Sequence, residues 1–474
     1  MKQKIFLIYP RLKLQVYSLW PPQGIVLLAT ILKKEGYDVH IIDSSFDNSQ
    51  SKIKTIIKNE KPTLVCVSIS TDLFNESKEI VSFAKKQSIK TFAGGPYVSL
   101  EPFFVMDQIP DLDFALTINN EKIFLESIKI ILSNNSPEKL SGVVFRKNNQ
   151  LKLNDCKDLP VNLNSLPMID YSLLPTIKQY FGIGTATIMG SRGCPFDCTF
   201  CQPVLKKIHG EKPRLKDPKN IIEEINYLNK FYNIKEFYFL DDTFGFNKQW
   251  LRKLVLQIEK HKLNQKIKFL VNSRVDLFDK EFISLLKRMN CKLVSFGVES
   301  GSQKILDSLN KRTTILQIIN AFKLCQINQI NTHANFMMNC PGETKETLKE
   351  TRELIKKIKP TILYLSFLTP YPGTYLYETC LNNNTLNLRC SKDFNCRSYS
   401  KSVLPVKNSS LTLKDFVNFR KTILRRRKPL LFYNIFIDLI KDLFEALKHH
   451  EVKLFFYKYI FRLKVFIYSQ NYFG

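Results

Sequence analysis

The sequence predicts an α/β protein with two successive strand–helix regions, residues 1–135 and 185–384, followed by a helical C-terminal region. In both regions, apolar runs of strand length alternate with segments of helix length. Runs such as Thr63 to Ser68 are almost wholly apolar, which is typical of parallel strands buried on both faces. Glycines and polar residues follow these runs, at the edge where α/β folds bind ligands.

The first region, residues 1–135, is predicted to form a doubly wound parallel sheet. Its ligand-binding edge would carry Ser68, Gly94 and Gly95, which end or follow predicted strands. The expected strands are Lys4 to Tyr9, Asp38 to Asp43, Thr63 to Ser68, Thr91 to Ala93 and Asp113 to Thr117, and the expected helices are Gly24 to Lys34, Asn75 to Lys86 and Glu121 to Leu132.

Residues 136–184 are predicted to be a linker. The strand–helix alternation loosens there, and three Leu-Pro pairs interrupt the chain among Asn and Ser residues.

The second region, residues 185–384, contains six strand–helix units, which predict a partial (β/α)6 barrel of the TIM type. In such barrels the active site lies at the carboxyl ends of the strands. The expected strands are Ala186 to Gly190, Glu236 to Leu240, Lys268 to Asn272, Lys292 to Gly297, Thr332 to Met338 and Thr361 to Phe367, and the expected helices are Pro218 to Asn229, Lys248 to Lys260, Lys280 to Met289, Thr314 to Gln326 and Glu346 to Ile358.

The last region, residues 385–474, reads as helical, basic and aromatic. From residue 411 onward it holds 13 Lys and Arg against 5 Asp and Glu. Two interpretations stay open: a helical cap with solvated cationic faces, or an interfacial helix resting on anionic lipid.

The composition limits the class of protein. A hydrophobic fraction of 44% supports large cores, and no run of about 18 apolar residues predicts a membrane-spanning helix. Eleven cysteines without a recognisable secretory signal predict reduced thiols in the cytoplasm. The net charge of +28 comes mostly from Lys spread along the chain, so nucleic-acid binding is not expected.

Cys194, Cys198 and Cys201 carry the strongest chemical signal, with C-x3-C-x2-C spacing directly after the first strand of the second region. Three thiolates this close can hold an iron–sulfur cluster, which normally has four ligands. A missing fourth ligand leaves one position open, as in catalytic metal sites. The alternative is a Cys3His zinc site completed by His209.

The cysteine loop resembles that of the radical S-adenosylmethionine (SAM) superfamily. Later strand ends resemble motifs of the same superfamily in the same order, and the N-terminal half resembles the cobalamin-binding domain of one large subfamily. That subfamily includes radical methyltransferases and the anaerobic cyclase of bacteriochlorophyll synthesis. The resemblance covers about residues 1–375. Its segments are Phe239 to Phe244, Gly297 to Gly301, Cys340 to Thr344, Pro370 to Thr374, Trp20 to Gly24 and Gly36 to Asp43.

The resemblance implies roles for individual residues. The three cysteines would bind three irons of a 4Fe-4S cluster, and the fourth iron would take the amino and carboxylate groups of SAM. An electron from the cluster would then cleave SAM to methionine and a 5′-deoxyadenosyl radical that removes a substrate hydrogen. Asp241 and Asp242 stand where the family contacts the methionine amino group, and Arg274 and Glu299 where ribose or carboxylate contacts are usual. The remaining cofactor candidates are Pro341 and Gly342 near the adenine and Ser68, Gly94 and Gly95 in the cobalamin-binding-like domain.

Plainer interpretations stand beside these roles. Asp241 and Asp242 would cap the helix that starts near Asn247, and Glu299 would be a turn residue. Cys66, Cys291 and Cys325 are expected to be buried thiols, whereas Cys340, Cys380, Cys390 and Cys396 could hold a second cluster.

Cobalamin binding rests on fewer residues. His40, in Asp38-Val39-His40, is interpreted as a strand residue rather than a cobalt ligand, and Asn119-Asn120-Glu121 replaces the acidic glycine-rich stretch of related chains.

We therefore predict a cytoplasmic radical SAM enzyme that carries a 4Fe-4S cluster, SAM and cobalamin and methylates an unactivated carbon. Radical cyclisation or rearrangement, RNA modification and a non-catalytic cluster protein are the alternatives. The expected partners are a small-molecule or lipid-like substrate and an electron donor such as flavodoxin or ferredoxin, with peripheral contact to the inner membrane face through the C-terminal region.

Overall fold

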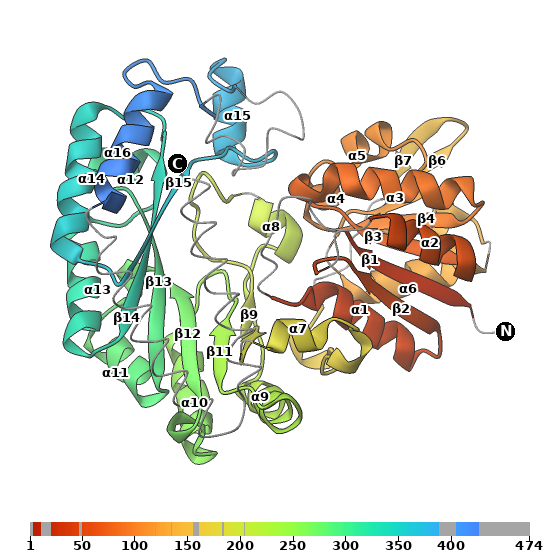
Figure 1. The fold of residues 1–474 in the computed structure, drawn as a ribbon, viewed down its shortest axis with the longest axis horizontal. Coiled ribbons are helices and arrows are strands. Elements are labelled where there is room, and N and C mark those ends of the chain that lie inside the picture. The colour runs from red at the N-terminus through yellow and green to blue at the C-terminus, as the bar shows by residue number, and fades with distance from the viewer. Residues whose placement is uncertain are drawn as a thin grey trace. The chain divides into compact units, whose positions relative to one another are not determined.

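The computed structural model describes residues 3–10, 20–46, 50–118, 120–133, 135–154, 161–182, 184–202, 204–387 and 404–425. The chain forms two compact units (Figure 1). The first comprises residues 1–180 and 203–214, and the second comprises residues 181–202 and 215–474. Among the described residues, no helix has both the length and the apolar character needed to cross a bilayer.

The first unit contains a seven-stranded sheet with the order β2-β1-β3-β4-β5-β6-β7. Strands β1 to β5 are parallel, and their order is that of a doubly wound fold. Such folds bind ligands where the strand order reverses, which here is between β1 and β3. These strands are β1 (Lys4–Tyr9), β2 (Asp38–Asp43), β3 (Leu64–Ser68), β4 (Lys90–Gly94) and β5 (Phe114–Leu116). The doubly wound prediction is confirmed, with every strand within one residue of its expected range.

Helices cover both faces of this sheet. Helices α1 and α6 pack together on one face and α2 and α3 on the other (Figure 1). The helices are α1 (Gln23–Lys34), α2 (Gln50–Glu60), α3 (Phe74–Lys86), α4 (Pro96–Leu100), α5 (Pro102–Gln108), α6 (Glu121–Leu132), α7 (Ile177–Phe181) and α8 (Val204–His209). Helix α8 groups with this unit, although residues 185–384 were expected to form one domain.

The predicted linker, residues 136–184, is partly a hairpin. Strands β6 (Val143–Lys147) and β7 (Gln150–Leu153) pair antiparallel and extend the first sheet beyond β5. Asn148 and Asn149 join them with φ of 50° and 61°, as a two-residue type I′ turn requires. The linker prediction for residues 143–153 is therefore wrong, because the polar Asn-Asn pair closes a hairpin.

The second unit is built on a six-stranded sheet with the order β15-β14-β13-β12-β11-β8. All neighbours are parallel and follow chain order, as a partial barrel requires. The strands are β8 (Thr185–Ile188), β11 (Glu236–Phe239), β12 (Lys268–Ser273), β13 (Cys291–Glu299), β14 (Asn331–Met338) and β15 (Ile362–Phe367), with the two-residue strands β9 (Ser191–Arg192) and β10 (Arg214–Leu215) elsewhere. Each of the six lies within two residues of its expected range.

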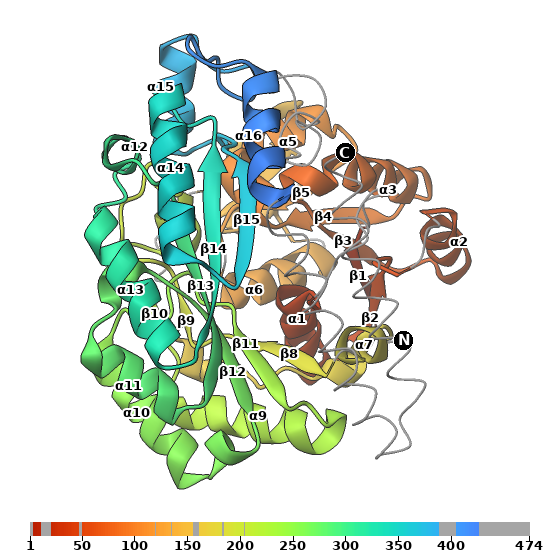
Figure 2. The same ribbon diagram turned by 60° about the vertical axis from the view of Figure 1, so that its left-hand side comes forward.

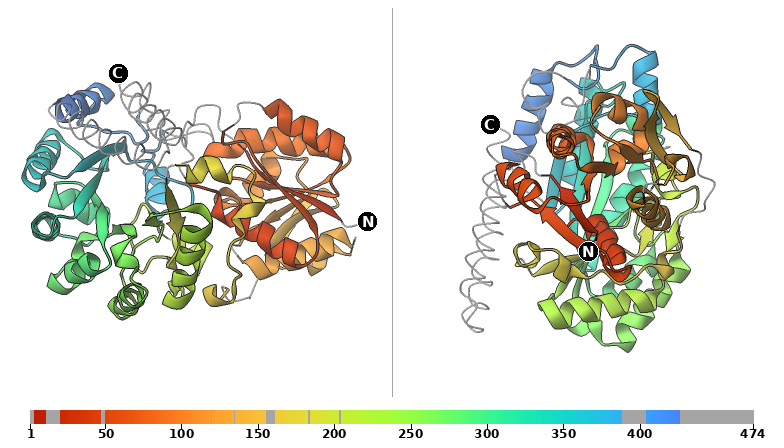
Figure 3. Two further views of the ribbon diagram at one scale, coloured as in Figure 1. Left: turned by 60° about the horizontal axis from the view of Figure 1, so that its bottom comes forward. Right: turned by 90° about the vertical axis from the view of Figure 1, so that its right-hand side faces the viewer.

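Helices lie in an arc on one side of these strands (Figure 2; Figure 3, left). Along β14, Thr332, Ala334, Phe336 and Met338 are buried, whereas the alternate residues are only partly buried. One face of the sheet therefore packs on helices, and the other face is available for polar contacts. The helices are α9 (Pro218–Tyr232), α10 (Lys248–Lys260), α11 (Lys280–Arg288), α12 (Gln303–Ser308), α13 (Ile315–Ile327), α14 (Lys345–Ile358), α15 (Tyr375–Asn382) and α16 (Leu413–Arg425).

The described part of the C-terminal region belongs to the second unit. Leu386 and Val406 form an antiparallel bridge, and Phe416 of α16 packs edge-on against Phe367 of β15. The predicted basic aromatic helices beyond residue 425, together with Cys390 and Cys396, lie outside the described residues.

Candidate active site

The cysteine loop starts at the carboxyl end of β8, the first strand of the second sheet. Cys198 is buried, and Cys194 and Cys201 are partly exposed. The backbone NH of Cys201 donates to the Cys198 carbonyl at 3.1 Å, so the last turn of the loop is closed by its own backbone.

Asp241, just beyond β11, holds the start of the loop. Its carboxylate accepts hydrogen bonds from the Gly190 NH at 2.7 Å and the Ser191 hydroxyl at 2.6 Å. Burial raises the pKa of Asp241 to about 7. A Cβ at Gly190 would lie 2.6 Å from the Trp250 ring, so only glycine lets the loop pass this point. Both oxygens of Asp241 thus position the loop that carries the cysteines.

Asp242 and Thr243 contact the next part of the loop. The exposed Asp242 carboxylate accepts from the Gly193 NH at 3.0 Å, and the Thr243 hydroxyl lies 3.3 Å from Cys194 Sγ. Helix α10 is instead capped by Asn247, whose side chain accepts from the Trp250 NH at 2.9 Å. The interpretation of Asp241 and Asp242 as helix caps is therefore wrong.

The far side of the loop is clamped by the segment after α12 and by the start of α15. The Thr199 NH donates to the Leu309 carbonyl at 3.0 Å, and the Asn310 amide donates to the Asp197 carbonyl at 2.8 Å. The Leu376 NH donates to the Thr199 carbonyl at 3.0 Å. The cysteines thus sit on a backbone held from both sides, which preorganises a site.

Arg274, just beyond β12, reaches the central cysteine. Its Nη1 donates to Cys198 Sγ at 3.3 Å, and its Cζ lies 3.8 Å from the centre of the Phe196 ring. Nε and Nη2 bind both oxygens of Asp276, and Nη2 also donates to the Lys311 carbonyl at 2.6 Å. Arg274 is 5% exposed, so its guanidinium is fixed by these partners.

Glu299 and Lys311 form a buried ion pair beside the loop. The Lys311 amine lies 2.8 Å from the Glu299 carboxylate and 5.7 Å from the centre of the Phe200 ring. Burial opposes the charge of Lys311, but Glu299 and Cys198 together more than offset it, so the pKa of Lys311 is raised. Glu299 has φ of +66°, and a Cβ at Gly297 would lie 2.3 Å from its Oε1. Glu299 is thus both a turn residue and a buried charge.

The three thiols form an all-sulfur donor set on one loop, the kind of set that holds an iron–sulfur cluster. Burial raises the pKa of Cys194, and burial followed by the nearby Cys198 raises that of Cys201 to about 12. Buried thiolates need positive charge beside them, which bound iron would supply. Among the described residues, no three His, Cys, Asp or Glu converge on one metal ion. Three thiols that each bind a different iron agree with this spacing.

The remaining second-unit candidates lie at the end of β14. Glu343 Oε2 accepts from the Asn339 and Cys340 backbone NH groups at 2.5 and 3.2 Å, and burial raises the pKa of Glu343 to about 7. Gly342 is exposed with φ of +79°, and a Cβ there would meet no atom within 4 Å. Pro341 is partly exposed, so the tip of this loop is open to a ligand.

The other described cysteines are buried. Cys340 and Cys380 pack in an apolar cluster with Leu309, Leu368 and Val406. The interpretation of Cys66, Cys291 and Cys325 as buried thiols is confirmed.

The first unit brings Ser68, Gly94 and Gly95 together at the carboxyl ends of β3 and β4. A Cβ at Gly95, which has φ of +112°, would lie 2.7 Å from the Ile69 carbonyl and 3.2 Å from Ser68 Oγ. A Cβ at Gly94 would meet nothing within 4 Å. His40 is exposed on β2 and pairs with Asp38 at 3.0 Å, as expected of a strand residue.

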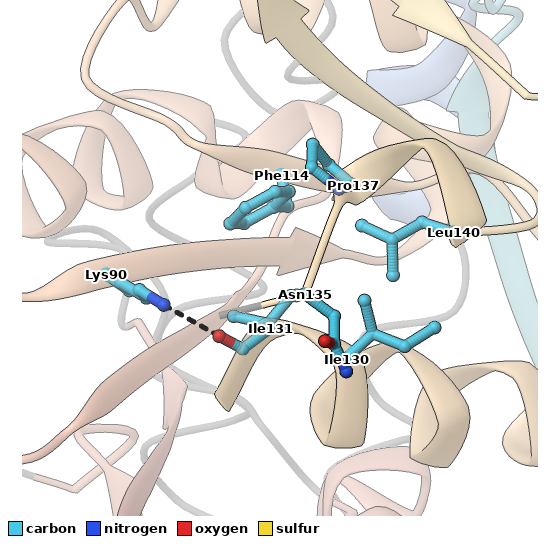
Figure 4. Close-up of a pocket in the computed structure, with 7 residues that line it drawn as sticks. All are labelled: Lys90, Phe114, Ile130, Ile131, Asn135, Pro137 and Leu140. Atoms are coloured by element: carbon cyan, nitrogen blue, oxygen red, sulfur yellow. Dashed lines mark hydrogen bonds between the residues drawn. The ribbon is translucent and has the colours of Figure 1, made fainter. Parts of the chain in front are cut away.

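A shallow pocket in the first unit lies at the opposite edge of the sheet (Figure 4). Lys90 at the start of β4 and Phe114 at the start of β5 line it, and the Lys90 amine donates to the Ile131 carbonyl at 2.7 Å. Ligands of doubly wound folds bind at the carboxyl ends, so we do not assign this pocket a role in the chemistry.

Sequence reasoning missed the side chains that surround the cysteines. Lys311 lies in a polar segment that follows no strand end, and no local pattern distinguishes it from other lysines. Phe196 and Phe200 stood inside the cysteine motif, and two aromatic residues between cluster ligands were a signal that could have suggested a shielded site.

Comparison with known families agrees with this geometry. The family model described as the Radical SAM superfamily matches residues 188–355, and the one described as B12 binding domain matches residues 12–126. The first match falls on the second unit, apart from residues 203–214, and the second match falls on the first unit.

Individual relatives resemble most of the chain. An uncharacterized methyltransferase of Pyrococcus horikoshii is 31% identical over 455 residues, covering 94% of this chain and 95% of its own. The anaerobic magnesium-protoporphyrin IX monomethyl ester cyclase of Cereibacter sphaeroides is 25% identical over 77% of this chain and 61% of its own. The fold resembles that of the radical SAM methyltransferase TsrM of Kitasatospora setae, solved with cobalamin and a [4Fe-4S] cluster, with a TM-score of 0.69 and 18% identity over 81% of this chain and 75% of that one.

Proposed function

Because the chain belongs to the radical SAM enzymes that also carry a B12-binding domain, we propose that it methylates an unactivated carbon of a small-molecule or lipid-like substrate. Its cofactors are a 4Fe-4S cluster, SAM and cobalamin. When bound, the cluster supplies the electron that cleaves SAM into methionine and a 5′-deoxyadenosyl radical, and cobalamin serves as the methyl carrier.

The cysteine loop carries this proposal. Cys194, Cys198 and Cys201 are three thiols on one loop at the carboxyl end of β8, where barrel active sites lie. The donor set is all sulfur, which suits the irons of an iron–sulfur cluster. Asp241 fixes the start of this loop through its hydrogen bonds to Gly190 and Ser191.

The carboxyl ends of β3 and β4 support cobalamin binding in the first unit. Gly94 leaves open space beside the backbone. Gly95 has a positive φ and packs closely against the backbone of Ile69. We place cobalamin at these strand ends, with Ser68 beside them.

A row of neutral polar residues supports a neutral hydrogen-bonding substrate. Hydrogen bonds join Tyr238, Asn272, Ser295, His333 and Asn335 across β11 to β14, on the face opposite the helices. Burial lowers the pKa of His333, so it is neutral at pH 7, and its Nε2 has no partner in the described structure. We infer that the substrate presents hydroxyl, carbonyl or amide groups here. A substrate whose only polar groups are phosphates or carboxylates would contradict this inference.

Anaerobic reconstitution tests the function. The chain, loaded with iron, sulfide and cobalamin, should bind about four iron atoms. With reductant, SAM labelled in its methyl group and an extract of small molecules and lipids, it should release 5′-deoxyadenosine and label a product. The Cys198→Ala variant should bind much less iron. Its yield of 5′-deoxyadenosine should fall to the level seen without reductant.

The matched control is Cys325→Ala, which removes a buried thiol far along the chain in α13 and should leave the iron content unchanged. A full iron load in Cys198→Ala would reject the ligand assignment. Formation of 5′-deoxyadenosine without methyl label in any product would favour cyclisation, the activity named for the Cereibacter relative.

We propose two partners, one from the cluster chemistry and one from the composition of the C-terminal region. The cluster requires an external electron donor, such as flavodoxin or ferredoxin. The 13 Lys and Arg against 5 Asp and Glu from residue 411 onward, interleaved with aromatic residues, support contact with an anionic membrane. Co-sedimentation with phosphatidylglycerol vesicles, compared with phosphatidylcholine vesicles, tests this contact, and equal sedimentation would reject it.

A further inference from the structure

Both phenylalanines of the cysteine loop lie under a buried cation. Phe196 separates Cys194 from Cys198, and the Arg274 guanidinium stacks on its ring at 3.8 Å. Phe200 separates Cys198 from Cys201 and lies 5.7 Å from the Lys311 amine. Cations are attracted to the faces of aromatic rings, so these contacts help to hold the loop and the two cations in place.

Arg274 differs from Lys311 in that it reaches a sulfur atom. Its Nη1 donates to Cys198 Sγ at 3.3 Å, whereas the Lys311 amine is taken by Glu299 at 2.8 Å. Asp276 balances the charge of Arg274, and the two side chains are 17% and 6% exposed, respectively. The influence of Arg274 on the sulfur therefore comes from the donated N–H rather than from a net positive charge.

The other guanidinium contacts prevent Arg274 from turning toward a different ligand. Nε and one hydrogen of Nη2 bind Asp276, and the second hydrogen of Nη2 binds the Lys311 carbonyl. The planar fork is thus held on two sides and stacked on Phe196.

We propose that Arg274 sets the reduction potential of the cluster through its hydrogen bond to Cys198 Sγ. The inference rests on the proposed function, because it requires Cys198 as a cluster ligand. A hydrogen bond to a ligating sulfur withdraws electron density and stabilises the reduced cluster, so it makes the cluster easier to reduce. Arg274 is then a positioning residue that acts through Cys198.

Redox titration of the reconstituted full chain in the absence of SAM tests the proposal. The reduced cluster is measured by electron paramagnetic resonance at a fixed solution potential. Arg274→Gln shortens the side chain so that its amide does not reach Cys198 Sγ. The ratio of reduced to oxidised cluster should therefore fall about tenfold, as expected for loss of a hydrogen bond to a charged group. For a one-electron couple, that factor corresponds to about 59 mV.

Arg312→Gln is the matched control. Arg312 lies near the same loop, 3.8 Å from Asp197, but its side chain is 67% exposed. Solvent screens its charge, so this variant should keep the ratio within about twofold of the unsubstituted chain. Arg274→Lys keeps a cation beside Asp276 but lacks the planar guanidinium. It should lower the ratio of reduced to oxidised cluster several-fold, and it provides the test if the cluster assembles poorly in Arg274→Gln.

The outcomes separate this inference from the function on which it rests. An unchanged ratio in Arg274→Gln or Arg274→Lys with a full iron load overturns the inference alone. An effect that appears only when SAM is added assigns Arg274 to SAM binding and also overturns it. An unsubstituted chain that binds no cluster overturns the proposed function together with the inference.

Discussion

Glu343 shows how one buried carboxyl makes stability depend on pH. Burial raises its pKa to about 7 from an ordinary value of 4.5. Between pH 4.5 and 7, Glu343 keeps its proton in the folded chain and loses it in the unfolded chain. The contribution of Glu343 to the free energy of unfolding therefore falls as pH rises from about 4.5 to 7. The slope reaches at most about 1.4 kcal/mol per pH unit.

We predict that Glu343→Gln removes this contribution. The glutamine carbonyl can still accept from the Asn339 and Cys340 NH groups, so the variant should gain stability over the unsubstituted chain as pH rises from 5 to 7. Urea unfolding of the apoprotein at several pH values measures the difference. Glu346→Gln, at a fully exposed position three residues later, should show no such gain, and parallel pH profiles for the unsubstituted chain and Glu343→Gln would refute the prediction.

At the cysteine site, the residue identities could be predicted but their partners could not. The thiols and Asp241 were predicted from motifs, yet Asp241 binds Gly190 and Ser191, 51 and 50 residues earlier in the chain. Arg274 meets Cys198 across 76 residues. Such pairs depend on which strand ends lie side by side, which no local pattern specifies.

At the scale of elements, the end of β13 is fixed by close packing on α14. A Cβ at Gly301 would lie 2.4 Å from the Thr351 Cα and 2.8 Å from the Glu350 carbonyl. These are helix backbone atoms, which cannot move as a flexible side chain can. The exit of β13, which carries Glu299, thus depends on a glycine two residues later.

We predict that Gly301→Ala lowers the free energy of unfolding by about 2–3 kcal/mol, within the range for overpacked positions. Urea unfolding followed by tryptophan fluorescence and circular dichroism measures it. Gly94→Ala, where a Cβ meets nothing within 4 Å, should stay within about 0.5 kcal/mol of the unsubstituted chain. Equal effects of the two substitutions would show that the close approach at Gly301 relaxes without cost.

Most elements could be predicted because their periodicity is local. Helix α10 was predicted at its observed bounds, Lys248–Lys260, from its amphipathic pattern. Strands β6 and β7 were missed because short strands around Asn148 and Asn149 resemble a polar loop until they pair with β5.

At the scale of the whole molecule, the two units should load their cofactors independently. The cysteine loop belongs entirely to the second unit, and Ser68, Gly94 and Gly95 belong to the first. Each unit has its own sheet, so damage to one binding edge need not unfold the other.

We predict that Gly94→Val fills the open space beside β4 and lowers cobalamin binding at least about tenfold while the iron content stays the same. Cys198→Ala should show the reverse pattern. Absorbance and metal analysis after reconstitution measure both cofactors. Lys90→Val, at the amino end of the same strand, should retain cobalamin, and loss of cobalamin in this variant would place the binding site at the pocket in Figure 4.

The sequence by itself determined the two α/β regions, the succession of strands and helices along the chain and the three-cysteine loop, because these follow from periodicity and spacing over a few residues. Only the tertiary structure decided that Arg274 donates to Cys198, that Glu299 pairs with Lys311 and that Asp241 anchors the loop. The physical reason is that side-chain partners are chosen by the register of strands far apart in the chain. The cysteines therefore specify the cluster chemistry, and the folded barrel specifies the groups that position and tune it.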